Sequence, residues 1–127
     1  MSAEGPSVLT GRRILVVEDE PFIALTLEDM LTELGCVVAG MVSQVSDALA
    51  FIASEPIDGA VLDVNLGAHK IDPVADALSA RAKPFVFTTG YGRSGVPENH
   101  NHRGVVQKPF RLDELATALS LAFRSRG

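Results

Sequence analysis

The chain has 127 residues, a length that fits one folded domain but not a domain with a second folded module. Apolar residues make up 46% of it and charged residues 21%, a composition typical of globular proteins and not of disordered tails. The formal net charge of −5 and the lack of an obvious Lys and Arg cluster argue against a nucleic-acid-binding surface. No apolar run approaches the roughly 20 residues that a membrane span needs, so we expect a cytoplasmic chain without a membrane segment.

Residues 1–11 are predicted to form a loose N-terminal segment, and residues 12–127 a single domain. The first predicted strand of this domain is "RILVVE" (13–18). Pro21 suits the first turn of the helix that follows. The apolar residues of this helix recur on one face until Gly35 ends the pattern.

Cys36 is the only cysteine, which excludes an internal disulfide. We interpret it as a small apolar residue at the start of the second strand, "CVVAG" (36–40). Ser43 or Ser46 can cap the second helix. This helix leads to the third strand, "GAVLD" (59–63).

Asp72 and Pro73 are predicted to begin a third helix, which leads to the fourth strand, "FVFTT" (85–89). The fifth strand is "GVVQK" (104–108), and apolar residues spaced three to four apart predict a last helix over 112–123. Strands that alternate with helices indicate a parallel sheet, because each connection must carry the chain back across a face of the sheet. We therefore predict a doubly wound α/β domain with five parallel strands.

One connection departs from this alternation. The segment 90–103, "GYGRSGVPENHNHR", contains Val96 as its only aliphatic residue and offers no apolar face to the sheet. The helix expected between the fourth and fifth strands is therefore predicted to be short or absent. The segment is interpreted either as a variable surface loop or as a mobile recognition segment. We interpret His100 and His102 as solvated loop residues, with a weak metal clip as the alternative.

Polar side chains stand where four of the predicted strands end. In an open α/β sheet, ligands bind at the carboxyl ends of the strands. Converging carboxylates repel each other unless a cation or a lysine compensates their charge. Carboxylate oxygens are the ligands that Mg²⁺ prefers, and its sites usually leave positions open for phosphate oxygens. Each of these polar residues has a simple structural explanation when taken alone, but together they predict a site that holds a phosphoryl group. The residues are Glu18, Asp19, Asp63, Thr89 and Lys108.

Four motifs in this order resemble the receiver domain of bacterial two-component response regulators, and the match runs from Arg12 to Phe123. The motifs are "VVEDE" (16–20), "LDVNL" (62–66), "TTG" (88–90) and "KPF" (108–110). The resemblance implies a flavodoxin-like sheet and a stand-alone response regulator, with residues 12–127 as the receiver domain. It also implies that Asp63 accepts a phosphoryl group from a phosphohistidine of a sensor histidine kinase or phosphotransfer protein, giving an acyl phosphate.

The other site roles are likewise implied by the resemblance. Mg²⁺ would be coordinated by Asp63, Asp19 and the backbone carbonyl of Asn65, and by Glu18 directly or through water. Lys108 would pair with Asp63 at rest and with a phosphoryl oxygen afterwards. Thr89 would bind another phosphoryl oxygen, which shifts the population toward a second conformation that a downstream protein target recognises. We expect no enzyme activity beyond the chain's own phosphotransfer and dephosphorylation.

The chain also departs from the common receiver pattern. Val105 occupies the position, three residues before Lys108, where many receivers carry a switching aromatic residue. The segment "FTTGYG" (87–92) resembles a receiver subgroup that reads Phe, small residue, Thr, Gly, hydrophobic residue and has a reduced fourth helix. Tyr91, next to Gly90, could act as the moving aromatic or simply pack on the loop. The residues at 65 and 91 would help to set the lifetime of the acyl phosphate.

The reduced connection removes much of the face through which receivers of transcription regulators dimerise. We therefore expect a monomer or weak dimer that binds protein partners and no nucleic acid. A phosphatase of the haloacid dehalogenase type would also use an aspartyl phosphate, but it needs a second aspartate where this chain has Asn65. A receiver-like interaction module that is never phosphorylated stays open as the alternative.

Overall fold

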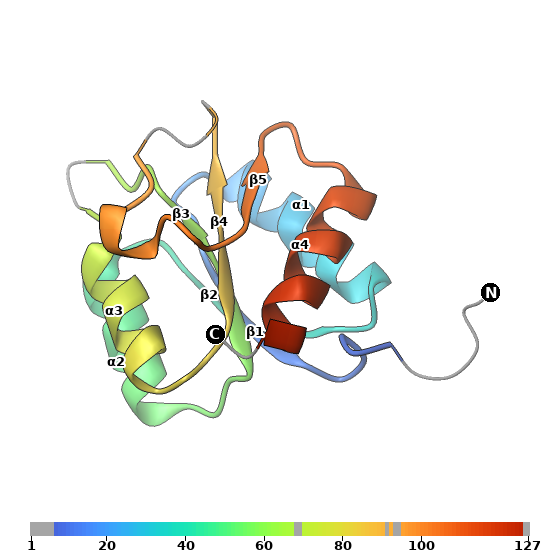
Figure 1. Cartoon of the computed structure of the whole chain (residues 1–127), viewed down its shortest axis with the longest axis horizontal. Coiled ribbons are helices and arrows are strands. Elements are labelled where there is room, and N and C mark those ends of the chain that lie inside the picture. Colours follow the sequence, from blue (N-terminus) through green and yellow to red (C-terminus); the bar gives the residue numbers. More distant parts are fainter. Residues whose placement is uncertain (1–6, 68–69, 91, 93–94, 126–127) are drawn as a thin grey trace.

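The computed structural model describes residues 7–67, 70–90, 92 and 95–125. Five parallel strands form one sheet in the order β2-β1-β3-β4-β5, as the alternation of strands and helices predicted (Figure 1). The strands are β1 (Arg13–Val17), β2 (Val37–Val42), β3 (Gly59–Asp63), β4 (Phe85–Thr89) and β5 (Val105–Gln107). The helices are α1 (Pro21–Glu33), α2 (Val45–Ser54), α3 (Asp72–Ala80) and α4 (Leu112–Ser125), the last of which follows β5.

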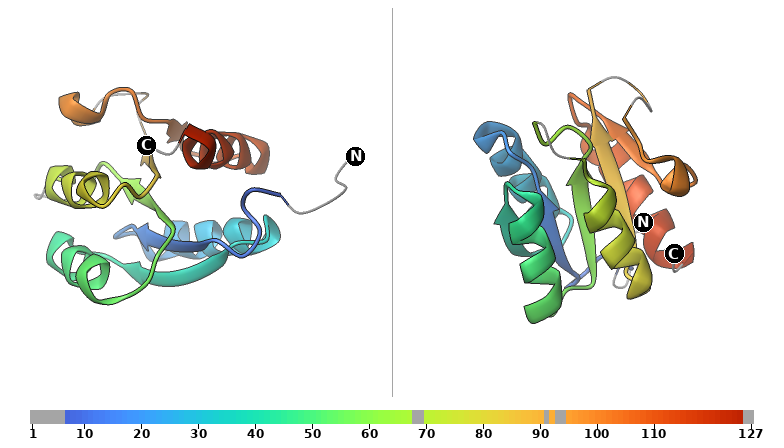
Figure 2. Two further views of the ribbon diagram at one scale, coloured as in Figure 1. Left: turned by 60° about the horizontal axis from the view of Figure 1, so that its bottom comes forward. Right: turned by 90° about the vertical axis from the view of Figure 1, so that its left-hand side faces the viewer.

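Helices cover both faces of the sheet, with α1 and α4 on one face and α2 and α3 on the other (Figure 2). Successive side chains of a strand point to opposite faces, so each strand contributes to two apolar clusters. On the α1/α4 face the buried strand residues include Val16, Val61 and Val86. On the α2/α3 face they include Leu62 and Phe87. The three central strands are buried on both faces, which explains their nearly continuous apolar sequences.

The second strand differs from this expectation. Its sequence is as apolar as those of the central strands, but Val37 is 44% exposed and Met41 is 41% exposed. Strand β2 lies at the edge of the sheet and, among the described strands, pairs with β1 alone, so the helices cover it incompletely. The apolar run alone could not distinguish this edge strand from a central one.

The helix boundaries confirm some of the predicted signals and contradict others. Helix α1 begins at Pro21, and Gly35, just after the helix, adopts a φ of +90°, which is unfavourable for other residues. The predicted capping of α2 by Ser43 or Ser46 is wrong, because Gln44 is the N-cap residue and its side chain makes no capping hydrogen bond to the described residues. Packing of its apolar face therefore holds α2 in place without a side-chain cap.

The N-terminal segment is described from Ser7 onward. Residues 7–11 form turns, and Leu9 is only 2% exposed because it packs into the cluster on the α1/α4 face. This burial anchors the chain just before β1. No helix in the described ranges is long and apolar enough to cross a membrane.

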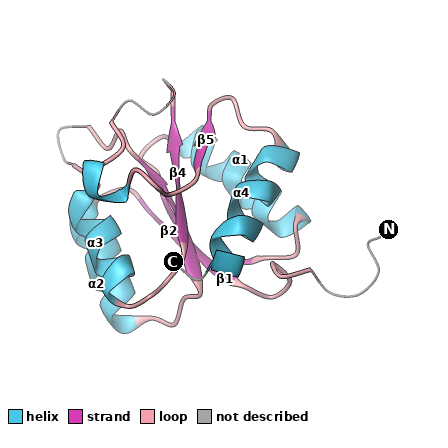
Figure 3. Cartoon of the chain, in the orientation of Figure 1, coloured by secondary structure: helices cyan, strands magenta, loops and turns pink. Residues whose placement is uncertain are grey.

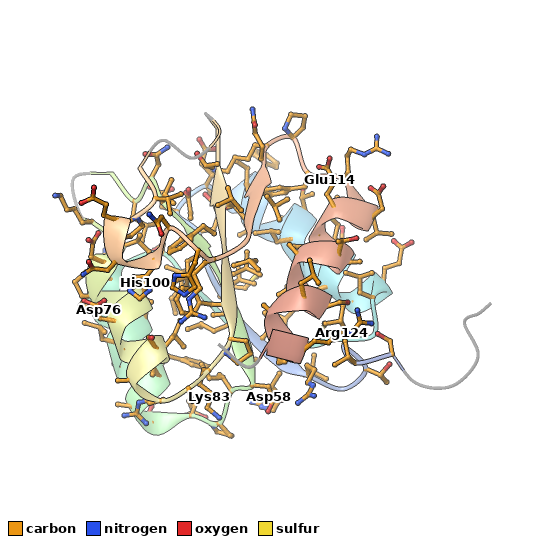
Figure 4. The ribbon with its side chains drawn as sticks, viewed as in Figure 1. Asp58, Asp76, Lys83, His100, Glu114 and Arg124 are labelled. Carbon is orange, nitrogen blue, oxygen red and sulfur yellow. The ribbon has the colours of Figure 1, made fainter. Side chains whose placement is uncertain are left out.

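A single 3-10 turn, Glu98–His100, replaces a full helix between β4 and β5 in the described part of this connection, as the sequence predicted (Figure 3). The prediction that His100 is solvated is wrong, since its side chain is buried beside Phe85, with the ring centroids 5.6 Å apart. His100 Nε2 lies 2.8 Å from Asp76 Oδ1 on α3 (Figure 4). The Arg103 guanidinium lies 4.3 Å from the centre of the Phe85 ring. These two polar side chains cover β4 where a full helix would otherwise pack, whereas His102 is exposed.

Candidate functional site

The polar residues predicted to gather at the carboxyl ends of the strands do so around one cleft of about 850 Å³. The ends of β1, β3 and β5 lie together at the upper edge of the sheet in Figure 1. The cleft is open to solvent on one side and bounded by the start of α1 and by the segment after β5. Its lining includes Asp19, Asp63, Asn65, Gly90 and Lys108.

Three carboxylates converge at this cleft. Glu18, Asp19 and Asp63 each offer a carboxylate oxygen, and these oxygens lie within 4.8 Å of one another. The convergence follows from the sheet register, because Val17 pairs with Leu62 and the next residues on the two strands are Glu18 and Asp63. Glu18 is 4% exposed and Asp63 is 1% exposed, whereas Asp19 is exposed. Two of the three carboxyl groups therefore lie in the protein interior.

One cation compensates these charges incompletely. Lys108 Nζ lies 3.5 Å from Glu18 Oε1 and 3.5 Å from Asp63 Oδ1. Burial raises the pKa of Glu18 to about 7, and the charge of Asp63 adds to this rise. The Glu20 N–H and the Lys108 ammonium act in the opposite direction. The site thus carries an excess of negative charge, which favours the binding of a further cation.

Backbone groups hold the two buried carboxylates in place. The Asn65 N–H donates to Asp63 Oδ1 over 3.0 Å, and the Glu20 N–H donates to Glu18 Oε2 over 3.0 Å. Both are bonds to a donor two residues further along the chain, a pattern that is typical of turns. The carboxylates are therefore oriented before any ligand arrives.

The donor set fits a hard divalent cation such as Mg²⁺. Glu18 Oε1 is buried and accepts no hydrogen bond from any residue that the structure describes. A buried oxygen without a hydrogen-bond donor is destabilising, and a cation beside Asp19 and Asp63 would satisfy it. The predicted metal ligands Glu18, Asp19 and Asp63 are thus close enough to share one ion, and Asn65 follows Asp63 by two residues at the same edge.

The remaining predicted site residues lie around this cluster. Thr89 is fully buried at the end of β4, and its carbonyl oxygen accepts the Lys108 N–H over 2.8 Å. Gly90 lines the cleft, and Val105 is half-buried against the cluster on the α2/α3 face. Tyr91 lies outside the described residues, so its predicted switching role stays a prediction.

Thr88, for which the sequence predicted no role, lies next to Asp63. Strand β4 pairs with β3 so that Asp63 and Thr88 are partners in register. Thr88 is fully buried, and its Oγ1 has no hydrogen-bond partner within the described ranges. One feature of the sequence could have pointed to Thr88. In "FTTGYG" (87–92) it is a hydroxyl residue at the position where the similar receiver subgroup has a small residue.

Comparison with known proteins shows which family the chain resembles in sequence and fold. Residues 14–120 match the family model of the response regulator receiver domain. The solution structure of SdrG from Sphingomonas melonis Fr1 is 48% identical, with a TM-score of 0.81 over 94% of this chain and 99% of that one. The BeF3-activated conformation of SdrG from Pseudomonas melonis Fr1 is 46% identical, with a TM-score of 0.75 over 93% of this chain and 99% of that one.

Two curated regulators are related over most of this chain. The transcriptional regulatory protein PdtaR of Mycobacterium tuberculosis is 29% identical over 87% of this chain and 56% of its own length. The phyllosphere-induced regulator PhyR of Methylorubrum extorquens is 31% identical over 86% of this chain and 42% of its own length. The chain thus spans about half the length of these relatives. Receiver domains generally bind Mg²⁺ at an acidic site and interact with kinases and downstream targets. By its sequence match, its fold and its acidic cluster, this chain belongs to the response regulator receiver domain family of two-component signalling.

Proposed function

We propose that the chain is a single-domain response regulator that accepts a phosphoryl group on Asp63 in a Mg²⁺-dependent reaction. One observation carries this proposal: the Asp63 carboxylate is 1% exposed, yet it lines the cleft beside two further carboxylates, with Lys108 Nζ 3.5 Å away. A buried acid with a purely structural role needs neither the surplus of negative charge nor the cleft. A nucleophile that must meet a phosphorylated partner needs both a bound cation and access to the partner.

The phosphoryl donor is a phosphohistidine of a sensor histidine kinase or phosphotransfer protein. The Asp63 carboxylate attacks phosphorus, the P–N bond breaks, and the imidazole nitrogen takes the electron pair. The Asn65 N–H, 3.0 Å from Asp63 Oδ1, keeps the carboxylate in one orientation during the attack. Lys108 then moves from the carboxylate to a phosphoryl oxygen, where a more negative group attracts it.

Glu18, Asp19, Asp63 and the backbone carbonyl of Asn65 would hold Mg²⁺. When bound, the ion supplies positive charge for the phosphoryl oxygens. Glu18 must be ionised to act as a ligand, and its pKa of about 7 means that a proton competes for the same oxygen near neutral pH. Asp19 is exposed and forms the solvent side of the site.

Thr89 and the short connection after β4 carry the response to phosphorylation. Thr89 hydrogen-bonds a phosphoryl oxygen and draws the end of β4 toward Asp63, while its carbonyl remains bonded to the Lys108 N–H. The changed surface is read by a downstream protein, and no nucleic acid is bound. Support for a protein target comes from the PhyR relatives, one of which is the anti-anti-sigma factor PhyR of Bartonella quintana, 25% identical to this chain. We expect a monomer or weak dimer.

Intact-mass measurement after incubation with acetyl phosphate and Mg²⁺ tests the proposal. We expect the gain of one phosphoryl group, which is lost in EDTA and in the Asp63→Asn variant. Asp47→Asn, at an exposed aspartate in the first turn of α2, is the matched control and should be phosphorylated like the unmodified chain.

If the chain gains no phosphoryl group from acetyl phosphate, or from phosphorylated histidine kinases and phosphotransfer proteins, the proposed phosphotransfer is wrong. The chain would then be a receiver-like interaction module that works without phosphorylation. Retention of phosphorylation in Asp63→Asn would instead place the acceptor at another residue.

A further inference from the structure

The side chains on the α1/α4 face of the sheet form rows that cross the strands. Val16 pairs in register with Val61, and Val61 pairs with Val86, so these three valines form one row. Because side chains alternate between faces, the residues two positions further along lie on the same face. The next row therefore contains Glu18 and Asp63, and Thr88 continues it on β4.

Thr88 is the immediate neighbour of Asp63 in this row, because the register of β3 and β4 makes the two residues partners. On its other side Thr88 pairs with Val106 of β5. In-register side chains on one face of neighbouring strands are close enough to interact directly. The hydroxyl of Thr88 is thus placed between the carboxylate of Asp63 and an apolar part of the core.

The hydroxyl of Thr88 is anomalous in this position. The side chain is fully buried, and Oγ1 makes no hydrogen bond to the described residues. A buried hydroxyl without a partner destabilises a fold. Valine has almost the same shape, lacks this penalty, and is the residue found at Val86 and Val106 on the same face. Packing alone would therefore favour valine at position 88.

The carboxylate of Asp63, the in-register neighbour of Thr88, changes its own partners when the site is used. In the present structure Asp63 Oδ1 accepts the Asn65 N–H and lies 3.5 Å from Lys108 Nζ. Under the proposed function Lys108 moves to the phosphoryl group, so the Asp63 carboxyl group loses one of its two cationic or N–H partners. Rotation of a threonine side chain about χ1 is a small change that redirects the hydroxyl without a backbone shift.

We propose that Thr88 is a positioning residue for Asp63, whose hydroxyl donates a hydrogen bond to the Asp63 carboxyl group when that group carries a phosphoryl group. The inference rests on the proposed function of Asp63. In the unmodified protein the hydroxyl has no described partner and is destabilising, and in the loaded state it is satisfied. Thr88 therefore stabilises the state in which Asp63 carries a phosphoryl group relative to the state in which it does not. This role differs from that of Thr89, which is proposed to bind a phosphoryl oxygen.

The test uses beryllofluoride, the ligand of the activated SdrG structure, as a phosphoryl substitute in the presence of Mg²⁺. Its dissociation constant is measured by NMR titration of the full chain and of Thr88→Val, Thr88→Ala and Thr88→Ser. We expect the dissociation constant to rise about fivefold in Thr88→Val and Thr88→Ala, which is the effect of one neutral hydrogen bond. Thr88→Ser, which keeps the hydroxyl, should remain within about twofold of the unmodified chain.

A second measurement separates this role from packing. Thermal unfolding of the metal-free proteins should show Thr88→Val at least as stable as the unmodified chain, because the unpartnered hydroxyl is gone. Thr117→Val, at an exposed threonine of α4, is the control for removal of a hydroxyl elsewhere and should change neither measurement.

Equal beryllofluoride affinity in Thr88→Val and the unmodified chain would overturn the inference and leave the proposed function intact. Weakened binding in Thr88→Ser as severe as in Thr88→Ala would also overturn it, since the hydroxyl would then have no specific effect. If the unmodified chain neither binds beryllofluoride nor gains a phosphoryl group on Asp63, the proposed function fails and the inference fails with it.

Discussion

Lys108 Nζ lies 3.5 Å from Asp63 Oδ1, and the same ammonium lies 3.5 Å from Glu18 Oε1. The lysine is 21% exposed in its side chain, whereas both carboxylates are almost fully buried. Lys108 therefore places a positive charge inside the site. A bound metal ion would share the carboxylates of Glu18 and Asp63 with this ammonium group. This arrangement predicts opposite effects on metal binding and on phosphoryl binding when the lysine is removed.

Lys108→Gln should bind Mg²⁺ more tightly and beryllofluoride more weakly. The ammonium repels a metal ion at the same carboxylates, so its removal should lower the Mg²⁺ dissociation constant by roughly threefold, or about 0.7 kcal/mol. Loss of the charge-assisted contact to the phosphoryl oxygens should weaken beryllofluoride binding by about tenfold or more. Calorimetric titration measures both, with Arg111→Gln, at an exposed arginine, as the control. If Lys108→Gln binds both Mg²⁺ and beryllofluoride more weakly, the substitution has damaged the site as a whole.

Glu18 should make the metal-free protein less stable as the pH rises from about 4.5 to about 7. Burial raises the pKa of Glu18 to about 7 in the folded chain, from an ordinary value of 4.5. Between these values the folded chain binds a proton that the unfolded chain has lost, so the free energy of unfolding falls with pH, by at most roughly 3 kcal/mol. Urea unfolding in EDTA at pH 5 and pH 8 measures this loss.

Glu18→Gln is the matched variant for that experiment, because it keeps the shape of the side chain and cannot ionise. It should remove this part of the pH dependence of the free energy of unfolding. Added Mg²⁺ should stabilise the unmodified chain more at pH 8 than at pH 5, since the ion binds the ionised carboxylate. A pH dependence that is identical in both proteins would contradict the assignment of the titration to Glu18.

His100 should contribute to stability mainly through burial, and Asp76 only slightly through its charge. His100→Ala removes a buried ring from between α3 and Phe85 and should lower the free energy of unfolding by about 2–4 kcal/mol. The side chain of Asp76 is 63% exposed, so Asp76→Asn should cost less than about 1 kcal/mol. Denaturant unfolding provides the comparison, with exposed His102→Ala expected to be neutral. A loss in Asp76→Asn that matches the loss in His100→Ala would show that the ion pair dominates.

The sequence was informative where one physical rule determined the outcome. Apolar runs between helical patterns predicted five parallel strands, and the parallel arrangement places the ends of their sequences at one edge. Asp63, Asp19 and Lys108 could therefore be assigned to a common site before the structure was known. The described part of the connection between β4 and β5 forms a 3-10 turn in place of a full helix, and this followed from a segment with Val96 as its only aliphatic residue.

The sequence was misleading where the outcome depended on tertiary contacts. The burial of His100 depends on its contact with the ring of Phe85 on β4, and no local sequence pattern reveals a contact between these two residues. Gln44 replaces a serine as the N-cap of α2 because packing of the helix outweighs a single capping bond. The row that joins Thr88 to Asp63 depends on the register of β3 with β4, and two strands distant in sequence do not specify their register by composition.

Asp19 is the exposed member of the acidic cluster, so its charge should matter for metal binding and little for folding. Asp19→Asn removes a ligand and a negative charge, and it should raise the Mg²⁺ dissociation constant by about tenfold or more. The free energy of unfolding in EDTA should stay within about 0.5 kcal/mol of the unmodified value or rise, because one source of repulsion near Asp63 is removed. Asp29→Asn, at an exposed aspartate of α1, should change neither quantity. If Asp19→Asn binds Mg²⁺ as well as the unmodified chain does, then Glu18 and Asp63 hold the ion without it.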